Sequence, residues 1–162
     1  MTVIIPPPPV LVYRAEVCPE NAKLKALVTW WAASGPFPIK LLRGVTTDAE
    51  QLKLYAQGRW LPGNVVTNAK KASSSAHGHS GGLDAHPVRE LYANGNVKLI
   101  YLGTEADPAV RAEALARFKT YADLAEQRFG LKSGRDFPGL VDWPHLQDPD
   151  WETLPLSPGV TA

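Results

Sequence analysis

The sequence predicts an α+β fold in which a small antiparallel sheet has helices packed on one side. Its 162 residues suit one domain, and its 44% hydrophobic and 20% charged residues are typical of a folded protein. Helical and strand patterns follow one another without the strand–helix alternation of parallel folds. The 13 glycines and 15 prolines indicate long loops between them.

Two helices are expected in the first third of the chain. Pro19 suits the first turn of a helix over 19–33. Thr47 and Glu50 have the spacing of a capping box, and they open a second helix that Gly58 ends.

The longest predicted helix covers 107–129, with Asp107 as its N-cap. Apolar side chains recur along it every three or four residues, and we interpret them as core: Val110, Ala114, Phe118, Tyr121, Ala125 and Phe129. Strands are expected at 39–45, 83–88 and 97–102, and a long loop at 61–82.

Three parts follow from these patterns. Residues 1–18 read as a proline-rich arm, because consecutive prolines favour an extended backbone. Residues 19–147 form the predicted domain, and 148–162 a peripheral tail. The start of the chain lacks the basic residues of a signal peptide, so we expect synthesis in the cytoplasm.

Charge and cysteine content exclude several classes of protein. Seventeen basic and sixteen acidic side chains give a net charge of +1, so we expect no nucleic-acid partner. No apolar run approaches the ~20 residues that span a bilayer, so membrane insertion is not expected. Cys18 is the only cysteine, which excludes an intrachain disulfide and a thiolate-rich metal site.

The four histidines all fall in predicted loops or at strand ends. A catalytic zinc ion takes three nitrogen or oxygen ligands and keeps one position for water. His77, Asp84 and His145 could supply these ligands, with Asp142 as a nearby carboxylate. The residues alone leave other pairings open, among them His79 with His86, which have the same spacing of seven.

Four segments of the sequence resemble a known family. Ser75–Asp84 (Ser-Ala-His-Gly-His-Ser-Gly-Gly-Leu-Asp) is similar to the pattern Ser-x-His-x-x-Gly-x-Ala-x-Asp of the D-alanyl-D-alanine and L-alanyl-D-glutamate metallopeptidases. Asp142–Gln147 (Asp-Trp-Pro-His-Leu-Gln) resembles the element that closes the same domain. Leu54–Arg59 and Val66–Ala69 are similar to stretches of its phage endolysin branch.

The resemblance implies a hedgehog/DD-peptidase-like single domain with one Zn²⁺. His77, Asp84 and His145 would be the zinc ligands, and Asp142 the catalytic acid/base. Ser75 would support a ligand by a hydrogen bond. Trp143 would lie at the rim of the site.

The sequence departs from the family pattern upstream of the second helix. An arginine that faces the substrate is usual there, but this chain has Thr46. Arg43 or Arg59 is the candidate replacement, and each is therefore a candidate substrate-binding residue.

The resemblance further implies a peptidoglycan endopeptidase of phage lysis, a monomer that cleaves the L-alanyl-D-glutamate bond of the peptide stem. Such an enzyme would leave the cytoplasm through a holin pore and act on the cell wall. The alternative within the family is a D-alanyl-D-alanine carboxypeptidase or dipeptidase with the same metal site.

Two readings from other classes remain. Gly78–Gly82 matches Gly-x-Ser-x-Gly, which would make Ser80 the nucleophile of a serine hydrolase. That motif requires a strand before the serine and a helix after it, and the predicted elements supply neither. A wall-binding module without catalysis would require the candidate site to be inactive.

Overall fold

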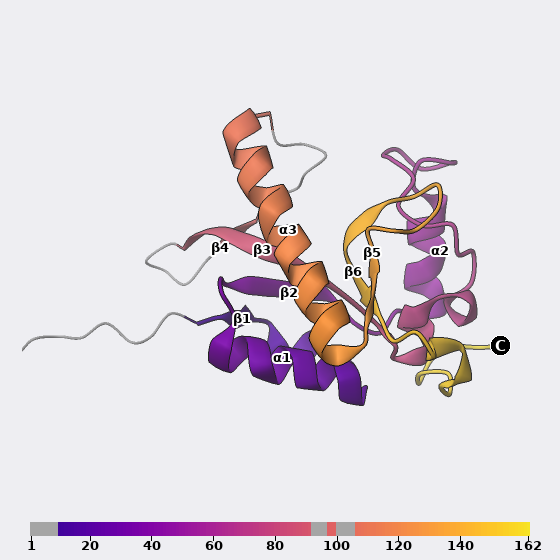
Figure 1. Cartoon of the computed structure of the whole chain (residues 1–162). Coiled ribbons are helices and arrows are strands. Elements are labelled where there is room, and N and C mark those ends of the chain that lie inside the picture. Colours follow the sequence, from indigo (N-terminus) through magenta and orange to yellow (C-terminus); the bar gives the residue numbers. More distant parts are fainter. Residues whose placement is uncertain (1–9, 92–96, 100–105) are drawn as a thin grey trace, which may run out of the picture.

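The computed structural model describes residues 10–91, 97–99 and 106–162 and has an α+β architecture, as predicted (Figure 1). The helices are α1 (Ala22–Ser34), α2 (Asp48–Ala56) and α3 (Pro108–Phe129). The strands are β1 (Val12–Tyr13), β2 (Ile39–Arg43), β3 (Gly82–Leu91), β4 (Val97–Leu99), β5 (Lys132–Gly134) and β6 (Asp142–Gln147). Short 3₁₀ turns are η1 (Ala15–Val17), η2 (Ala72–Ser74), η3 (Ala76–His79) and η4 (Trp151–Thr153).

The sheet is mixed rather than wholly antiparallel, which corrects the sequence prediction. Its strand order is β1-β2-β3-β6-β5, and β4 pairs with β3. β1 runs parallel to β2, and the other pairs are antiparallel. The chain passes through α1 between β1 and β2, and such a helical crossover is the connection that parallel neighbours require.

The core lies between the sheet and two of the helices. α1 and α3 cover one face of the sheet, and α2 lies apart from them, beyond β5 and β6 (Figure 1). Trp31 of α1 meets Tyr121 of α3 edge-on, with 5.3 Å between the ring centroids. The predicted apolar stripe of α3 is confirmed as core at four of its six positions: Ala114, Phe118, Tyr121 and Ala125 are buried.

Side-chain caps fix where the helices begin. α1 starts at Ala22, because the Asn21 side chain accepts hydrogen bonds from the backbone N–H groups of Lys23 and Leu24. The prediction that this helix starts at Pro19 was therefore three residues early. The capping box between Thr47 and Glu50 is confirmed at the start of α2.

The segments on either side of the predicted domain take part in the fold. Residues 1–9 of the expected arm lie outside the described residues, whereas 10–18 contribute β1 and η1. The expected tail also packs on the domain: the Asp148 N–H donates to the Gly81 carbonyl at 2.8 Å, and the Ser157 N–H to the Gly78 carbonyl at 2.8 Å. Among the described residues, no helix combines the length and hydropathy needed to cross a bilayer.

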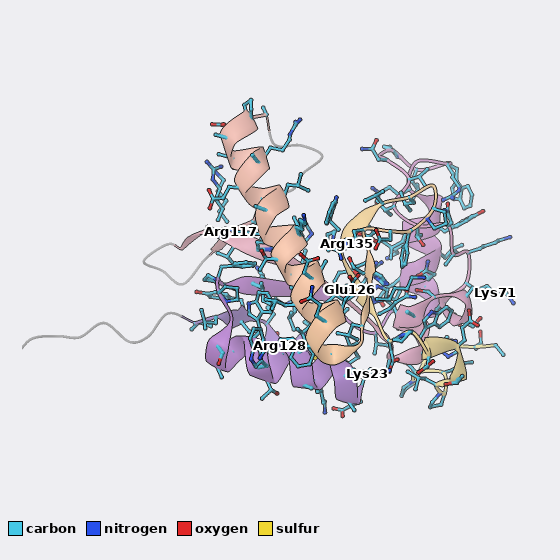
Figure 2. All side chains as sticks on the ribbon, viewed as in Figure 1. Lys23, Lys71, Arg117, Glu126, Arg128 and Arg135 are labelled. Carbon is cyan, nitrogen blue, oxygen red and sulfur yellow. The ribbon has the colours of Figure 1, made fainter. Side chains whose placement is uncertain are left out.

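An ion-pair network attaches the β5–β6 hairpin to α3 (Figure 2). Arg135 follows β5 and reaches back to α3, pairing with Asp123 at 2.6 Å and with Glu126 at 2.5 Å. The other Glu126 oxygen accepts the Ser133 N–H at 3.2 Å. This attachment fixes the strand pair whose second member, β6, carries Asp142 and His145.

Candidate metal centre

The three predicted ligands come together although they lie far apart in the sequence. His77 lies on η3, Asp84 on β3 and His145 on β6. β3 and β6 are antiparallel neighbours, and Asp84 is the register partner of His145. Of the described residues, these three form the group whose side chains could hold one metal ion.

The ligand atoms form a small triangle. His77 Nε2 lies 3.1 Å from His145 Nδ1. Asp84 Oδ1 lies 2.9 Å from His145 Nδ1 and 3.2 Å from His77 Nε2. Zinc bonds to nitrogen or oxygen of about 2.0–2.1 Å, arranged tetrahedrally, need ligand atoms about 3.3 Å apart. The triangle needs to expand only slightly to fit the ion.

In each imidazole ring, the nitrogen that points away from the other ligands lies beside a hydrogen-bond acceptor. This contact favours the tautomer that a metal ion requires. His77 Nδ1 lies 2.6 Å from the Gly44 carbonyl oxygen, which can only accept a hydrogen bond. His145 Nε2 lies 3.0 Å from Gln147 Oε1, also an acceptor. Each ring therefore donates outward and turns a lone pair toward the centre.

Two lone pairs and a carboxylate oxygen thus face one another. Such an arrangement is repulsive unless a cation lies among them, either a proton or a metal ion. The donor set of two imidazole nitrogens and one carboxylate oxygen suits Zn²⁺. The chemistry of these residues therefore fits the ion that the sequence predicts.

Burial and charge shift the pKa values of the three groups in different directions. Burial lowers the pKa of His77, which favours the neutral form of the ring. Burial alone would raise the pKa of Asp84, but His77, His145 and Arg43 outweigh it and hold that pKa well below its usual range. Burial also acts against a charged His145, yet the protonated ring would donate to Asp84, and this hydrogen bond together with the Asp84 charge raises the pKa of His145.

Asp142 lies at the start of β6, on a cavity of about 280 Å³ beside the two histidines. Burial is the main cause that raises the pKa of its carboxyl, and the negative charge of Asp84 adds to it. Asp142 is not part of the ligand triangle. A carboxyl group with a raised pKa beside a ligand cluster is suited to accept and return a proton.

The remaining predicted site residues have different positions. Ser75 lines the cavity, and its hydroxyl accepts the His77 backbone N–H at 3.3 Å, so it supports the ligand's backbone. Arg43 also lines the cavity, and it pairs with Asp84 at 2.6 Å. Arg59 instead stacks on Tyr55 and donates to the Thr67 carbonyl, in the loop that forms one wall.

The aromatic side chain at the cavity differs from the one predicted. Trp143 is half-buried and does not line the cavity, whereas Trp151 does. Trp151 belongs to η4, in the segment expected to be a peripheral tail. Its ring also packs on His79, with 5.2 Å between the centroids.

Sequence reasoning missed the residues that orient the ligands. The Gly44 carbonyl holds His77, and a Cβ at Gly44 would lie 2.0 Å from the Val17 carbonyl oxygen of η1. Gln147 holds His145 from within the same strand. The glutamine of the motif Asp-x-Pro-His-x-Gln, two residues after the histidine on one strand face, was the available signal for it.

The structure does not support the two other interpretations of this segment, in which His79 and His86 are metal ligands or Ser80 is a nucleophile. His79 directs its two ring nitrogens at the carbonyls of Leu154 and Ser73, at 2.7 and 3.0 Å. His86 packs on Phe118, and the two histidines do not meet in a ligand group among the described residues. Ser80 lies between η3 and β3, an order opposite to that of a nucleophile elbow, and its hydroxyl pairs with Ser157 at 2.6 Å.

Comparison with known proteins shows a weak structural likeness. No protein-family model matches the chain. The L-Ala D-Glu endopeptidase ChiX of Serratia marcescens is similar in structure, with a TM-score of 0.43 and 14% sequence identity. The similarity covers 79% of this chain and 76% of that one. A likeness this weak supports no conclusion about function. Any proposed function therefore has to rest on the residues of the chain's own site.

Proposed function

We propose that the protein is a zinc-dependent peptidase that cleaves the peptide stem of peptidoglycan, between L-alanine and D-glutamate. The observation that supports it most is the convergence of two imidazole lone pairs and one Asp84 oxygen, beside a cavity that Asp142 lines. The motifs around His77 and His145, which resemble those of peptidoglycan metallopeptidases, point to the substrate.

His77, Asp84 and His145 would hold the ion. A bound zinc ion would act as a Lewis acid that polarises the scissile carbonyl and makes water acidic enough to attack near neutral pH. Asp142 would accept the proton of the attacking water and return it to the leaving amine. The Gly44 carbonyl and Gln147 keep both imidazoles in the required tautomer throughout.

The cavity beside the metal centre opens to solvent, so a peptide could enter it. Its walls come from the loop 66–69, from the segment 74–77 and from residues of the β5–β6 connection. Peptide groups could contact both walls while a carbonyl faces the metal centre. We propose the peptide stem as the partner, met in the cell wall after release through a phage-type pore.

The test is a digestion of purified peptidoglycan, with the new termini identified by mass spectrometry. Cleavage at the proposed bond produces new L-alanine carboxyl ends, and a chelator abolishes it until zinc is added back. Release of free D-alanine would instead support a D,D-carboxypeptidase, which the same metal site could serve. No new termini with the zinc-loaded protein would refute both assignments.

A further inference from the structure

Arg43 has an unusual place in the sheet. The pairing of β2 with β3 follows one register from Ile39 to Leu41 and then shifts, so that Arg43 becomes the partner of Asp84. In the unshifted register Leu42 would lie opposite Asp84. The irregularity therefore replaces an apolar side chain with a guanidinium next to a candidate metal ligand, as bulges near functional sites do.

The contacts of Asp84 are divided between its two oxygens. Arg43 Nε and Nη2 both reach Oδ2, at 2.7 and 2.6 Å. Oδ1 faces the two histidines, at 2.9 Å from His145 Nδ1 and 3.2 Å from His77 Nε2. One carboxylate thus has one oxygen held by an arginine and the other directed at the metal centre.

We infer that Arg43 is a positioning residue that restricts Asp84 to metal ligation through Oδ1 alone. A carboxylate without such a partner can rotate or bind a metal ion through both oxygens. The guanidinium occupies Oδ2 with two donors and prevents both changes. A single-oxygen ligand keeps the coordination number low and leaves a position for water.

This role differs from contact with the substrate, the function first expected of Arg43. It rests on the proposed metal site but not on which peptide bond is cleaved. The Arg43 guanidinium has two opposing effects on metal affinity. Its positive charge repels the metal ion, whereas its hydrogen bonds hold the Asp84 carboxylate in the orientation that binds the ion. Partners that orient metal ligands typically contribute about 10–100-fold in metal affinity, so we expect the second effect to prevail.

The test compares wild type with Arg43→Gln, Arg43→Lys and Arg128→Gln. Arg128 lies on α3 over Trp30, so its replacement removes the same charge away from the metal centre (Figure 2). Thermal unfolding followed by circular dichroism confirms that each variant is folded. Metal-free proteins are then titrated with zinc against a chromophoric chelator, and with cobalt(II), whose visible absorption weakens as its coordination number rises.

Arg43→Gln is expected to bind zinc about 10–100-fold more weakly and to give weaker cobalt bands per bound ion. Arg43→Lys, which keeps the charge without the two-pronged donor, should fall between it and wild type, and Arg128→Gln should match wild type. Unchanged or tighter zinc binding by Arg43→Gln would overturn the inference about Arg43 and leave the proposed function unaffected. Wild-type binding by Arg43→Lys would also overturn that inference, and a wild-type protein that binds no zinc would overturn the proposed function.

Discussion

Replacing Asp148 with alanine removes the acceptor that joins the C-terminal segment to the start of α1. The buried Asp148 carboxylate accepts from Asn21 Nδ2 at 3.0 Å and from Lys23 Nζ at 2.7 Å. Asn21 is itself buried, and its Oδ1 caps α1. The carboxylate therefore holds in place the side chain that begins this helix.

The expected loss in the free energy of unfolding follows from the buried amide. Asp148→Ala removes the acceptor that Asn21 Nδ2 has in the structure, and a buried donor left without a partner costs about 1–3 kcal/mol. The ion pair with the more exposed Lys23 is left out of this figure. Asp148→Asn keeps an acceptor for Asn21 and should lose less.

Acid sensitivity gives a second measurement of the same contact. Burial alone would raise the pKa of Asp148, but the hydrogen bonds from Lys23 and Asn21 outweigh it and lower that pKa. A carboxyl with a lowered folded pKa contributes its full stability above the unfolded pKa of about 3.9, and loses it as pH falls below that value. Asp148→Asn lacks this contribution, so its difference from wild type should shrink below about pH 4.

Urea denaturation at pH 7 and at acid pH tests both expectations. Asp150→Ala is the matched control, because the exposed Asp150 lies 3.6 Å from Lys23 and should change stability little. A loss below about 0.5 kcal/mol for Asp148→Ala, within the range of ordinary surface substitutions, would refute the reasoning. So would a pH-independent difference between Asp148→Asn and wild type.

Three further substitutions test the site. Asp142→Asn should retain zinc, measured by metal analysis, and lose about 10²–10⁴ in kcat, because it removes a proton acceptor but no ligand; a near wild-type rate would contradict that role. Gly82→Ala would place a Cβ 2.9 Å from the His77 backbone nitrogen and displace this ligand. Zinc affinity, measured by competition with a chelator, should therefore fall by roughly tenfold or more. Unchanged affinity would contradict the tight packing of Gly82 on His77. Ser80→Ala should keep most of the activity on peptidoglycan, because its hydroxyl pairs only with Ser157 among the described residues, and an inactive but folded variant would support the serine-hydrolase alternative.

Local patterns in the sequence predicted the elements that local interactions fix. The spacing of Thr47 and Glu50 predicted the start of α2, and the apolar period over 107–129 predicted α3 and its buried face. The parallel edge strand β1 was not predictable in this way. Its two residues pair with Ile39 and Lys40, and pairing across an intervening helix leaves no local periodicity.

The candidate site likewise has residues that the sequence predicted and contacts that it could not predict. The motifs around His77 and His145 predicted the three residues that converge, because each motif is short and contiguous. Gln147 orients His145 from the same strand, whereas the Arg43 side chain and the Gly44 carbonyl come from longer-range contacts. Arg43 reaches Asp84 through a register irregularity, and the Gly44 carbonyl reaches His77 across 33 residues, so neither contact could be read from spacing.

Crystals grown with zinc, and diffraction data collected on either side of the zinc absorption edge, test the central claim most directly. An anomalous peak is predicted at about 2.0–2.2 Å from His77 Nε2, Asp84 Oδ1 and His145 Nδ1, with none at His79 or His86. A protein without a peak among these three atoms, or with its peak at another histidine, would contradict the account.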